Sequence, residues 1–237
     1  MRETALITGG AKRIGKEIAL LLSILGYNIA LHYNNSKKDA EETARQIYSN
    51  NAACEIFKAN LESEKDVSGL IKKVKRVFPH VSILVNSASV FEKSSLLETD
   101  AQFFNKHFNI NLKAPFLLSC EFVRTFKKGN IINILDTNVV KNKTAFSAYL
   151  LSKKSLSEFT ALSAVEFAPN IRVNAIAPGF ILPPKSKGNS YLQKRALNIP
   201  LKRRGFPSHI ALTVQFLLEN DYVTGQTIFV DGGEHLL

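Results

Sequence analysis

The stretch TALITGGAKRIG, residues 4–15, decides the fold of this chain. It opens with five apolar or β-branched residues, a pattern typical of a strand that is buried on both faces. Gly9 follows at once and allows the backbone to turn tightly, and Gly15 lets the next helix come close to a bound pyrophosphate. A helix that begins at such a turn offers free N–H groups and a partial positive charge to phosphate. The stretch therefore predicts a strand, a turn and a helix that bind a dinucleotide.

The same alternation of strand and helix continues to the end of the chain. Apolar, β-branched runs predict strands at 4–8, 27–32, 54–59, 81–86, 130–135, 171–176 and 227–230. Amphipathic segments between them predict helices at 13–25, 37–49, 64–77, 100–126, 146–168 and 207–219. Such an alternation implies right-handed crossovers and a parallel sheet. We predict an α/β fold, a single doubly wound Rossmann-type parallel sheet of about seven strands with helices on both faces, in one domain over residues 1–237.

One segment interrupts the alternation. It covers about residues 178–190, is rich in proline and lysine, and precedes a short helix. Irregular loops of this length in compact domains are usually lids or binding loops. We therefore expect this segment to cover part of a ligand site.

The composition is that of an ordinary soluble globular protein, with 45% hydrophobic and 22% charged residues among 237. No apolar run approaches the roughly 20 residues that cross a bilayer. The first predicted strand begins too early to leave room for a signal peptide. Cys54 and Cys120 lack metal-ligand spacing and are expected to be free thiols in a reducing compartment. We therefore expect a cytoplasmic protein with no membrane partner.

The net charge of +11 is spread along the chain, with small clusters at 72–76, 127–128 and 202–204. Nucleic-acid-binding proteins usually concentrate their positive charge in a stripe or a tail. We interpret the lysines as solvated helix faces whose field steers an anionic cofactor or substrate, and we expect no nucleic-acid partner. The five histidines have no ligand spacing, so no metal site is expected.

The residues after the second predicted strand indicate which nucleotide binds. Sites for NAD usually place an acidic residue there to hold the ribose hydroxyls. Here the first acid is Asp39, and the neutral residues before it are Tyr33, Asn34, Asn35 and Ser36. Positive side chains that would accept a 2′-phosphate lie nearby in the sequence, at Lys12, Arg13, Lys37 and Lys38. The pattern favours NADP(H) as the cofactor.

A tyrosine and a lysine suggest the chemistry. Tyr149 and Lys153 are four residues apart on a predicted helix and therefore share a face. An ammonium group at this spacing is expected to lower the pKa of the phenol and to hold the nicotinamide ribose. Tyr149 then becomes a proton donor or acceptor. The spacing alone occurs often by chance, so its meaning depends on the rest of the chain.

Further motifs supply that context over the whole length: Asn86-Ser87-Ala88-Ser89, Asn111, the segment 172–179 and the segment 223–233. With them the chain resembles the short-chain dehydrogenase/reductase superfamily. The resemblance implies a catalytic set of Asp136, Tyr149, Lys153 and Asn111, the last holding a water for proton relay. It implies that the cofactor contacts Gly9, Arg13, Ile14, Gly15, Tyr33, Asn34, Asn35, Ser36, Asn60, Leu61, Asn86, Ser87, Ala88, Tyr149, Lys153, Pro178 and Gly179.

Within the superfamily, three details are similar to the pteridine reductase and dihydromonapterin reductase branch. Arg13 stands where other members have glycine, Ser89-Val90-Phe91 follows the fourth strand, and Asp136 replaces the usual catalytic serine. The resemblance implies a substrate site formed by Arg13, Ser89, Phe91, Asp136 and Tyr149, in which Phe91 stacks on a flat heterocycle. Each residue also has a simpler interpretation: Arg13 as a solvated helix residue, Phe91 as core, Asp136 as a turn cap and Asn111 as a structural asparagine.

Three positions depart from the branch. Asn35 stands where trypanosomatid pteridine reductases have an arginine that binds phosphate, and Asn60 replaces an acid that often accepts from the adenine amino group. The threonine that usually follows the Pro178-Gly179 turn is absent, and the sequence there is Phe180-Ile181-Leu182. Cofactor contacts after Gly179 are therefore expected to be made by the backbone only.

The predicted function is the NADPH-dependent reduction of a dihydropterin to its tetrahydro form by a homotetrameric enzyme. The alternatives are a short-chain reductase of another carbonyl substrate, such as a 3-oxoacyl thioester, and a non-catalytic NADP-binding regulator. Asp136 and Phe91 argue against the first, and the intact pair of Tyr149 and Lys153 argues against the second. Which pterin is the substrate, and whether dihydrofolate is also used, stay open at this point.

Overall fold

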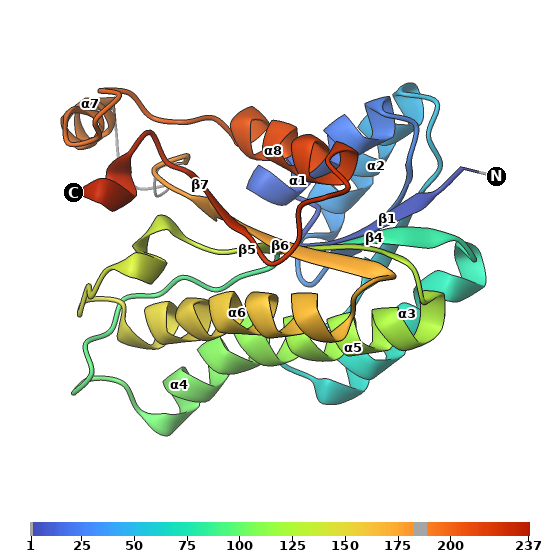
Figure 1. Cartoon of the computed structure of the whole chain (residues 1–237), viewed down its shortest axis with the longest axis horizontal. Coiled ribbons are helices and arrows are strands. Elements are labelled where there is room, and N and C mark those ends of the chain that lie inside the picture. Colours follow the sequence, from blue (N-terminus) through green and yellow to red (C-terminus); the bar gives the residue numbers. More distant parts are fainter. Residues whose placement is uncertain (1, 183–188) are drawn as a thin grey trace.

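A computed structural model of the chain describes residues 2–182 and 189–237, and its centre is one parallel sheet of seven strands (Figure 1). The strands are β1 (Thr4–Thr8), β2 (Asn28–Tyr33), β3 (Cys54–Lys58), β4 (Val81–Asn86), β5 (Gly129–Ile134), β6 (Ile171–Pro178) and β7 (Thr227–Val230). The predicted fold, a doubly wound parallel sheet, is confirmed, and every predicted strand lies within two residues of the observed one.

Helices cover both faces of this sheet (Figure 1). They are α1 (Arg13–Ile24), α2 (Lys37–Ser49), α3 (Glu64–Val77), α4 (Ala101–Phe108), α5 (Ala114–Phe126), α6 (Ser147–Glu166), α7 (Asn189–Leu197) and α8 (Pro207–Glu219). Three short helical turns are η1 (Asn109–Lys113), η2 (Thr137–Val140) and η3 (Glu234–Leu236). In the described part of the chain, no helix is both long and apolar enough to cross a membrane. Residues 183–188 of the predicted lid segment lie outside the described residues.

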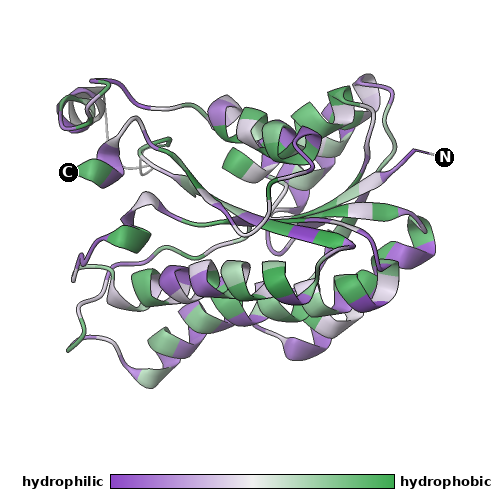
Figure 2. Ribbon diagram, in the orientation of Figure 1, coloured by the Kyte–Doolittle hydropathy of each residue, from purple (hydrophilic) through white to green (hydrophobic). Residues whose placement is uncertain are grey.

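The core forms on both sides of the sheet because successive side chains of a strand point to opposite faces. In β1, Ala5 and Ile7 pack in the cluster that also holds buried residues of α1, α2 and α8. Leu6 points the other way, into the cluster with α3 and α5. All three are fully buried, which explains why the strand is apolar along its whole length. Figure 2 colours the molecule by hydropathy and shows the two helix layers that enclose these strands.

The strand order β3-β2-β1-β4-β5-β6-β7 places the switch point between β1 and β4. The chain winds outward in one direction from β1 and in the other from β4, so the loops at their carboxyl ends diverge. In open α/β sheets, ligands bind in the crevice that this divergence leaves. The glycine turn after β1 and the turn after β4 lie at this point.

The helix predicted over 100–126 is not continuous, so this prediction was wrong. The structure divides it into α4, the wider π-helical turn η1 and α5. The N–H of Ala114 bonds to the carbonyl of Asn109, five residues back instead of four. Pro115 has no N–H to donate to the carbonyl of Asn111, which removes one α-helical bond in this region. A widened turn accommodates that loss, and such turns are frequent at functional sites.

Candidate active site

The glycine turn after β1 fits a dinucleotide because larger residues have no room there. Gly9 has a positive φ of 65°, and a Cβ atom on it would lie 2.9 Å from the Cα atom of Ala88. A Cβ atom on Gly15 would overlap the carbonyl oxygen of Gly9. The start of α1 therefore packs directly against the turn, and its N-terminus is open to an anion. These residues fit the pyrophosphate of the predicted cofactor.

Thr8, which the sequence analysis did not place in the site, joins the two turns at the switch point. Its hydroxyl oxygen accepts hydrogen bonds from the backbone N–H groups of Ser87, at 3.0 Å, and Ala88, at 3.1 Å. The hydroxyl also donates to the carbonyl of Val85 at 3.3 Å. The turn after β4 is thus held against the glycine turn after β1.

His32, also not predicted, forms a second link within the cradle. The N–H of Gly9 donates to its Nδ1 at 3.1 Å, and its Nε2 lies 3.1 Å from the carbonyl oxygen of Ala59. Burial lowers the pKa of His32 to about 4, which keeps the ring neutral with its proton on Nε2. Ala59 precedes the predicted cofactor contacts Asn60 and Leu61, of which Asn60 is the one expected at the adenine. The imidazole therefore ties the phosphate end of the cradle to its adenine end.

The predicted adenine contact has backbone support. The N–H of Asn60 donates to a carboxylate oxygen of Asp66 at 2.8 Å, and the side-chain Oδ1 of Asn60 accepts from the N–H of Glu62 at 3.1 Å. One lone pair of that oxygen remains for an amino group. Leu61 is buried beside it.

The predicted 2′-phosphate region lies between β2 and α2. Tyr33 is buried, whereas Asn35 is exposed, and Ser36 stands immediately before the first residue of α2. Two of the four predicted cations are paired with carboxylates, since the Lys12 ammonium lies 2.9 Å from Asp39 and the Lys37 ammonium lies 3.7 Å from Glu41.

Arg13 lies at the first position of α1 and is exposed. Its φ of 56° is unusual for a residue with a side chain and costs on the order of 1 kcal/mol. The positive φ belongs to the turn that opens the phosphate cradle. Its neighbour Ile14 is half-buried against the core.

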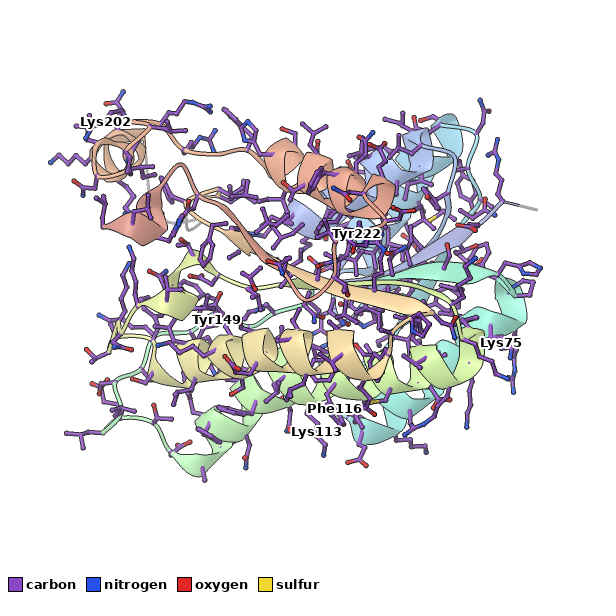
Figure 3. The ribbon with its side chains drawn as sticks, in the orientation of Figure 1. Lys75, Lys113, Phe116, Tyr149, Lys202 and Tyr222 are labelled. Atoms are coloured by element: carbon purple, nitrogen blue, oxygen red, sulfur yellow. The ribbon has the colours of Figure 1, made fainter. Side chains whose placement is uncertain are left out.

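The predicted reacting groups gather where β5 ends and α6 begins, and Figure 3 labels Tyr149 at this end of α6. The Tyr149 hydroxyl donates to Oδ2 of Asp136 at 2.9 Å. The other oxygen of Asp136 accepts from the backbone N–H and the side-chain amide of Asn138, at 2.8 and 2.6 Å. The Lys153 ammonium, which is buried, donates to the carbonyl of Ile134 at 2.7 Å.

The electrostatics of this group differ from the expectation. Burial, the Asp136 charge and the hydrogen bond to Asp136 raise the pKa of Tyr149 well above 10. The prediction that Lys153 lowers this pKa was therefore wrong, because burial and Asp136 dominate. Burial lowers the pKa of Lys153 itself to about 8, against an opposing effect of Asp136. Tyr149 is consequently protonated at neutral pH, so its hydroxyl carries a proton.

An aromatic wall stands beside Tyr149. Phe91, whose side chain is 57% exposed, stacks on Phe146 with ring centres 4.6 Å apart and planes 12° apart. The ring of Phe91 also meets Tyr149 edge to face at 4.7 Å. The core interpretation of Phe91 does not hold, since a core residue is not exposed to this extent. Phe146 was not predicted, and no short motif identifies it.

Asn111 holds the backbone of the Ser89–Phe91 segment. Its Oδ1 accepts from the Ser89 hydroxyl at 3.0 Å and the Val90 N–H at 2.9 Å, and its Nδ2 donates to the Val90 carbonyl and the Ser152 hydroxyl, both at 3.1 Å. All four positions of the amide are therefore used within the protein. The side chain of Asn111 therefore has a structural role and has no hydrogen-bonding position left for the predicted water.

Asn86 has a similar internal role. Its side-chain nitrogen donates to Asn133 at 2.9 Å and Ser119 at 3.3 Å, inside the core. Its side chain therefore faces away from the predicted cofactor contact, for which only the backbone remains. At the end of β6, after Pro178, Gly179 is required because a Cβ atom there would overlap Asp231.

Comparisons with known proteins agree with this geometry. Residues 9–235 match a protein family described as enoyl-(acyl carrier protein) reductase. The chain is 34% identical to the 3-oxoacyl-[acyl-carrier-protein] reductase FabG of Staphylococcus epidermidis, over the full length of both. It is 35% identical to the structure of FolM alternative dihydrofolate reductase 1 from Brucella canis complexed with NADP, with a TM-score of 0.93 over 99% of this chain and 95% of the other. Acetoin dehydrogenase YohF of Salmonella typhimurium superimposes with a TM-score of 0.92 at 28% identity, over 100% of this chain and 97% of the other.

Proposed function

Because the chain belongs to the short-chain dehydrogenase/reductase superfamily, in the family described as enoyl-(acyl carrier protein) reductase, we propose that this oxidoreductase reduces a dihydropterin to its tetrahydro form. Its cofactor is NADP(H). The observation that carries the proposal is the hydrogen bond of 2.9 Å between the Tyr149 hydroxyl and the Asp136 carboxylate, next to the exposed ring of Phe91. A carboxylate and a phenol match the donors and acceptors of an aminopterin ring, and Phe91 provides stacking area.

The chain's own residues would divide the work as follows. When bound, NADPH supplies the hydride. The Tyr149 hydroxyl, hydrogen-bonded to Asp136, carries the proton that a ring nitrogen of the substrate takes up. The Lys153 ammonium, fixed to the carbonyl of Ile134, keeps two further N–H donors for the ribose hydroxyls. Arg13, at the mouth of the cradle, offers a planar fork of donors to the pterin or to phosphate.

A second candidate is reduction of a 3-oxoacyl thioester. The 34% identity to FabG over the whole chain favours it, and the net charge of +11 would attract an acidic carrier protein. Asp136 opposes it, because a neutral ketone needs a hydroxyl group to orient it and offers no ring nitrogen. We therefore prefer a dihydropterin to a 3-oxoacyl thioester as the proposed substrate.

The deciding experiment measures NADPH oxidation with a dihydropterin, dihydrofolate and acetoacetyl thioester in parallel. We expect turnover of the pterins and little of the thioester. Asp136→Ser should then lower kcat/KM for the pterin roughly 100-fold, because a positioned acid–base group is lost. NADPH binding should survive, and ketone reduction need not fall in parallel. Equal losses on pterin and ketone, or none on pterin, would contradict the proposal.

We also propose that the enzyme is a cytoplasmic homotetramer. Exposed apolar side chains on α5 and α6 support assembly, including Phe116, Leu162 and Val165, with 45%, 70% and 83% of their surface exposed. Phe116, labelled in Figure 3, also meets Phe159 of α6, with ring centres 5.2 Å apart. Patches of this kind mark contacts between proteins. Light scattering should give four chains per particle, and Leu162→Asp should yield smaller particles.

A further inference from the structure

Asn138 donates two hydrogen bonds to a single oxygen of Asp136. Its backbone nitrogen lies 2.8 Å and its side-chain Nδ2 lies 2.6 Å from Oδ1 of that carboxylate. Both residues are half-buried, and Asn138 is the second residue of the turn η2, which Asp136 caps. The bond from the backbone N–H is the ordinary bond of such a cap. The bond from the side chain is additional, because a cap needs only the backbone donor.

These two bonds decide which oxygen of Asp136 is open. A carboxylate has about four acceptor positions, two on each oxygen. Asn138 takes both positions of Oδ1, and the Tyr149 hydroxyl takes one position of Oδ2 at 2.9 Å. With the hydrogen bonds of the described residues counted, one position is left. It lies on Oδ2, beside the tyrosine hydroxyl.

The turn η2 forms without help from the Asn138 side chain. The N–H of Lys141 donates to the backbone carbonyl of Asn138 at 2.9 Å and closes the turn. The hydroxyl of the buried Thr137 donates to the carboxylate of Asp231 and anchors the turn on the C-terminal segment. Truncation of the Asn138 side chain leaves these bonds and the backbone cap in place.

The charge of Asp136 fixes the orientation of the Asn138 amide. With Nδ2 on the carboxylate, the amide oxygen of Asn138 is buried, and no donor among the described residues reaches it. A buried acceptor without a partner is costly. The reversed amide would place this oxygen against a carboxylate oxygen, and two acceptors repel each other. The side chain thus keeps its donor on Asp136 while its acceptor stays unpaired, and a functional role is one explanation for such a group.

We propose that Asn138 is a positioning residue for the reduction. By occupying Oδ1, it holds the carboxylate of Asp136 with Oδ2 toward Tyr149, and it leaves on Oδ2 the one position that accepts an N–H of a heterocyclic substrate. This acceptor and the Tyr149 hydroxyl then lie side by side, so one edge of the ring meets both. The inference rests on the proposed function, because it takes Asp136 and Tyr149 as the groups that meet the substrate.

The test is a double-mutant cycle of Asn138→Ala and Asp136→Ala, which measures kcat/KM for a dihydropterin at saturating NADPH. Asn138→Ala removes only the side-chain donor, so kcat/KM should fall about tenfold, as expected when a reacting group is displaced. In the Asp136→Ala background the same change should alter kcat/KM by less than about twofold, because no carboxylate remains to be held. A residue that merely supports the turn would lower activity in both backgrounds.

Asn142→Ala is the matched control. Asn142 is an exposed asparagine in the loop that follows the same turn, and its side chain accepts from the Lys154 ammonium at 2.8 Å. The control therefore removes a side-chain hydrogen bond of similar length without a change at Asp136. Its kcat/KM should stay within about twofold of the wild type.

The isosteric variant Asn138→Asp replaces the donor by a second carboxylate against Asp136. Near pH 8 this variant should lose at least as much activity as Asn138→Ala. Near pH 6 the two carboxylates share a proton that restores the hydrogen bond, so its rate relative to the wild type should recover about tenfold. Tyr149, Lys153 and Lys143 also interact with the charge of Asp136, but they are the same in every variant. The relative rate of Asn138→Ala should therefore not recover.

Some results would overturn the inference and leave the proposed function standing. Equal losses from Asn138→Ala in both backgrounds would mean that the side chain only supports the turn. No loss from Asn138→Ala, or no recovery of Asn138→Asp near pH 6, would mean that Asp136 is held without this side chain. A wild-type enzyme that turns over no pterin, or an Asp136→Ala variant as active as the wild type, contradicts the proposed function itself.

Discussion

The cofactor half and the substrate half of this site are held together in different ways. At the switch point between β1 and β4, backbone groups and glycines form the cradle, and the contacts are close because Gly9 and Gly15 have no side chains. At the ends of β5 and β6, charged and aromatic side chains from distant segments form the site, as Asp136 and Tyr149 do. The structure of the cofactor half depends on the room that the glycines leave for close contacts. The structure of the substrate half depends on charges and hydrogen bonds between side chains.

This difference indicates what each half can tolerate. A cradle built from residues without side chains binds a ligand by its shape alone. Many reductases share such a cradle. The substrate half can change one charged residue at a time and alter which molecule is reduced. Substitutions in the two halves should therefore separate cofactor binding from substrate choice.

The largest effect is expected in the substrate half, from Tyr149→Phe. The variant keeps the ring that packs against Phe91 and removes only the hydroxyl that bonds to Asp136. Turnover should fall by about 10²- to 10⁴-fold, as for loss of a general acid, while NADPH binding stays nearly unchanged. Stopped-flow hydride transfer and NADPH titration measure the two effects. Near-wild-type rates would mean that Tyr149 is not the proton donor.

Gly15→Ala should produce the matching effect in the cofactor half. The new Cβ atom would overlap the carbonyl oxygen of Gly9, so the start of α1 must move away from the turn. We expect the free energy of unfolding to fall by about 1–3 kcal/mol. NADPH affinity should fall at least tenfold, or about 1.4 kcal/mol.

The control for this variant is Gly69→Ala, in the middle of α3. A Cβ atom on Gly69 meets only the far end of Lys73, at 4.0 Å. Alanine should stabilise that helix by about 0.5–1 kcal/mol. If Gly15→Ala unfolds like Gly69→Ala and keeps its NADPH affinity, the close approach of α1 is not what forms the cradle.

A pH dependence should link the halves through Lys153, whose pKa burial lowers to about 8 from an ordinary value of 10.5. Between these two values the unfolded chain keeps a proton that the folded chain has lost, so folding stability of the protein without cofactor rises with pH there. The titration of one group changes the free energy of unfolding by at most about 1.4 kcal/mol per pH unit. NADPH affinity should fall over the same range, because the Lys153 ammonium, which we propose to hold the ribose, loses its charge.

Chemical unfolding and NADPH titration between pH 7 and 11 measure both trends. In Lys153→Met the Lys153 contribution to each trend should disappear. If folding stability and NADPH affinity of the wild type both rise with pH, the assignment of the Lys153 amine to ribose binding is contradicted.

The smallest effect concerns cofactor choice. NADPH should bind at least tenfold more tightly than NADH, since Tyr33 to Ser36 contain no acid. Asn35→Arg should tighten NADPH by a further few-fold, about 0.5–1 kcal/mol, which is the range for an exposed ion pair. Isothermal titration with both nucleotides tests this, and comparable kcat/KM values for NADPH and NADH would contradict the cofactor assignment.

Much of the cofactor half and of the fold was predictable because their causes are local. The alternation in the strands and the glycines at 9 and 15 follow from rules that a single segment obeys. The π-helical turn at 109–113 was missed because its cause, a proline inside an otherwise helical pattern, usually marks only a kink. The raised pKa of Tyr149 was missed because its largest cause is burial, which the sequence does not report.

The substrate half was predictable only where a family motif marked a residue. Asp136, Tyr149 and Phe91 were found in this way, and the structure brings them together. Phe146 was missed, because it acts through a partner far along the chain and no spacing connects it to that partner. Thr8 and His32 were also missed, because they lie in strands whose sequence indicates only a buried core.

The imidazole of His32 makes the phosphate cradle sensitive to acid. Its Nδ1 accepts the N–H of Gly9 only while it carries no proton, and protonation would place two donors face to face. The unfolded chain takes up that proton near pH 6.5, whereas the folded chain resists until about pH 4. Acidification between these values therefore favours opening of the turn that receives the cofactor, and a bound dinucleotide would protect the protein against it.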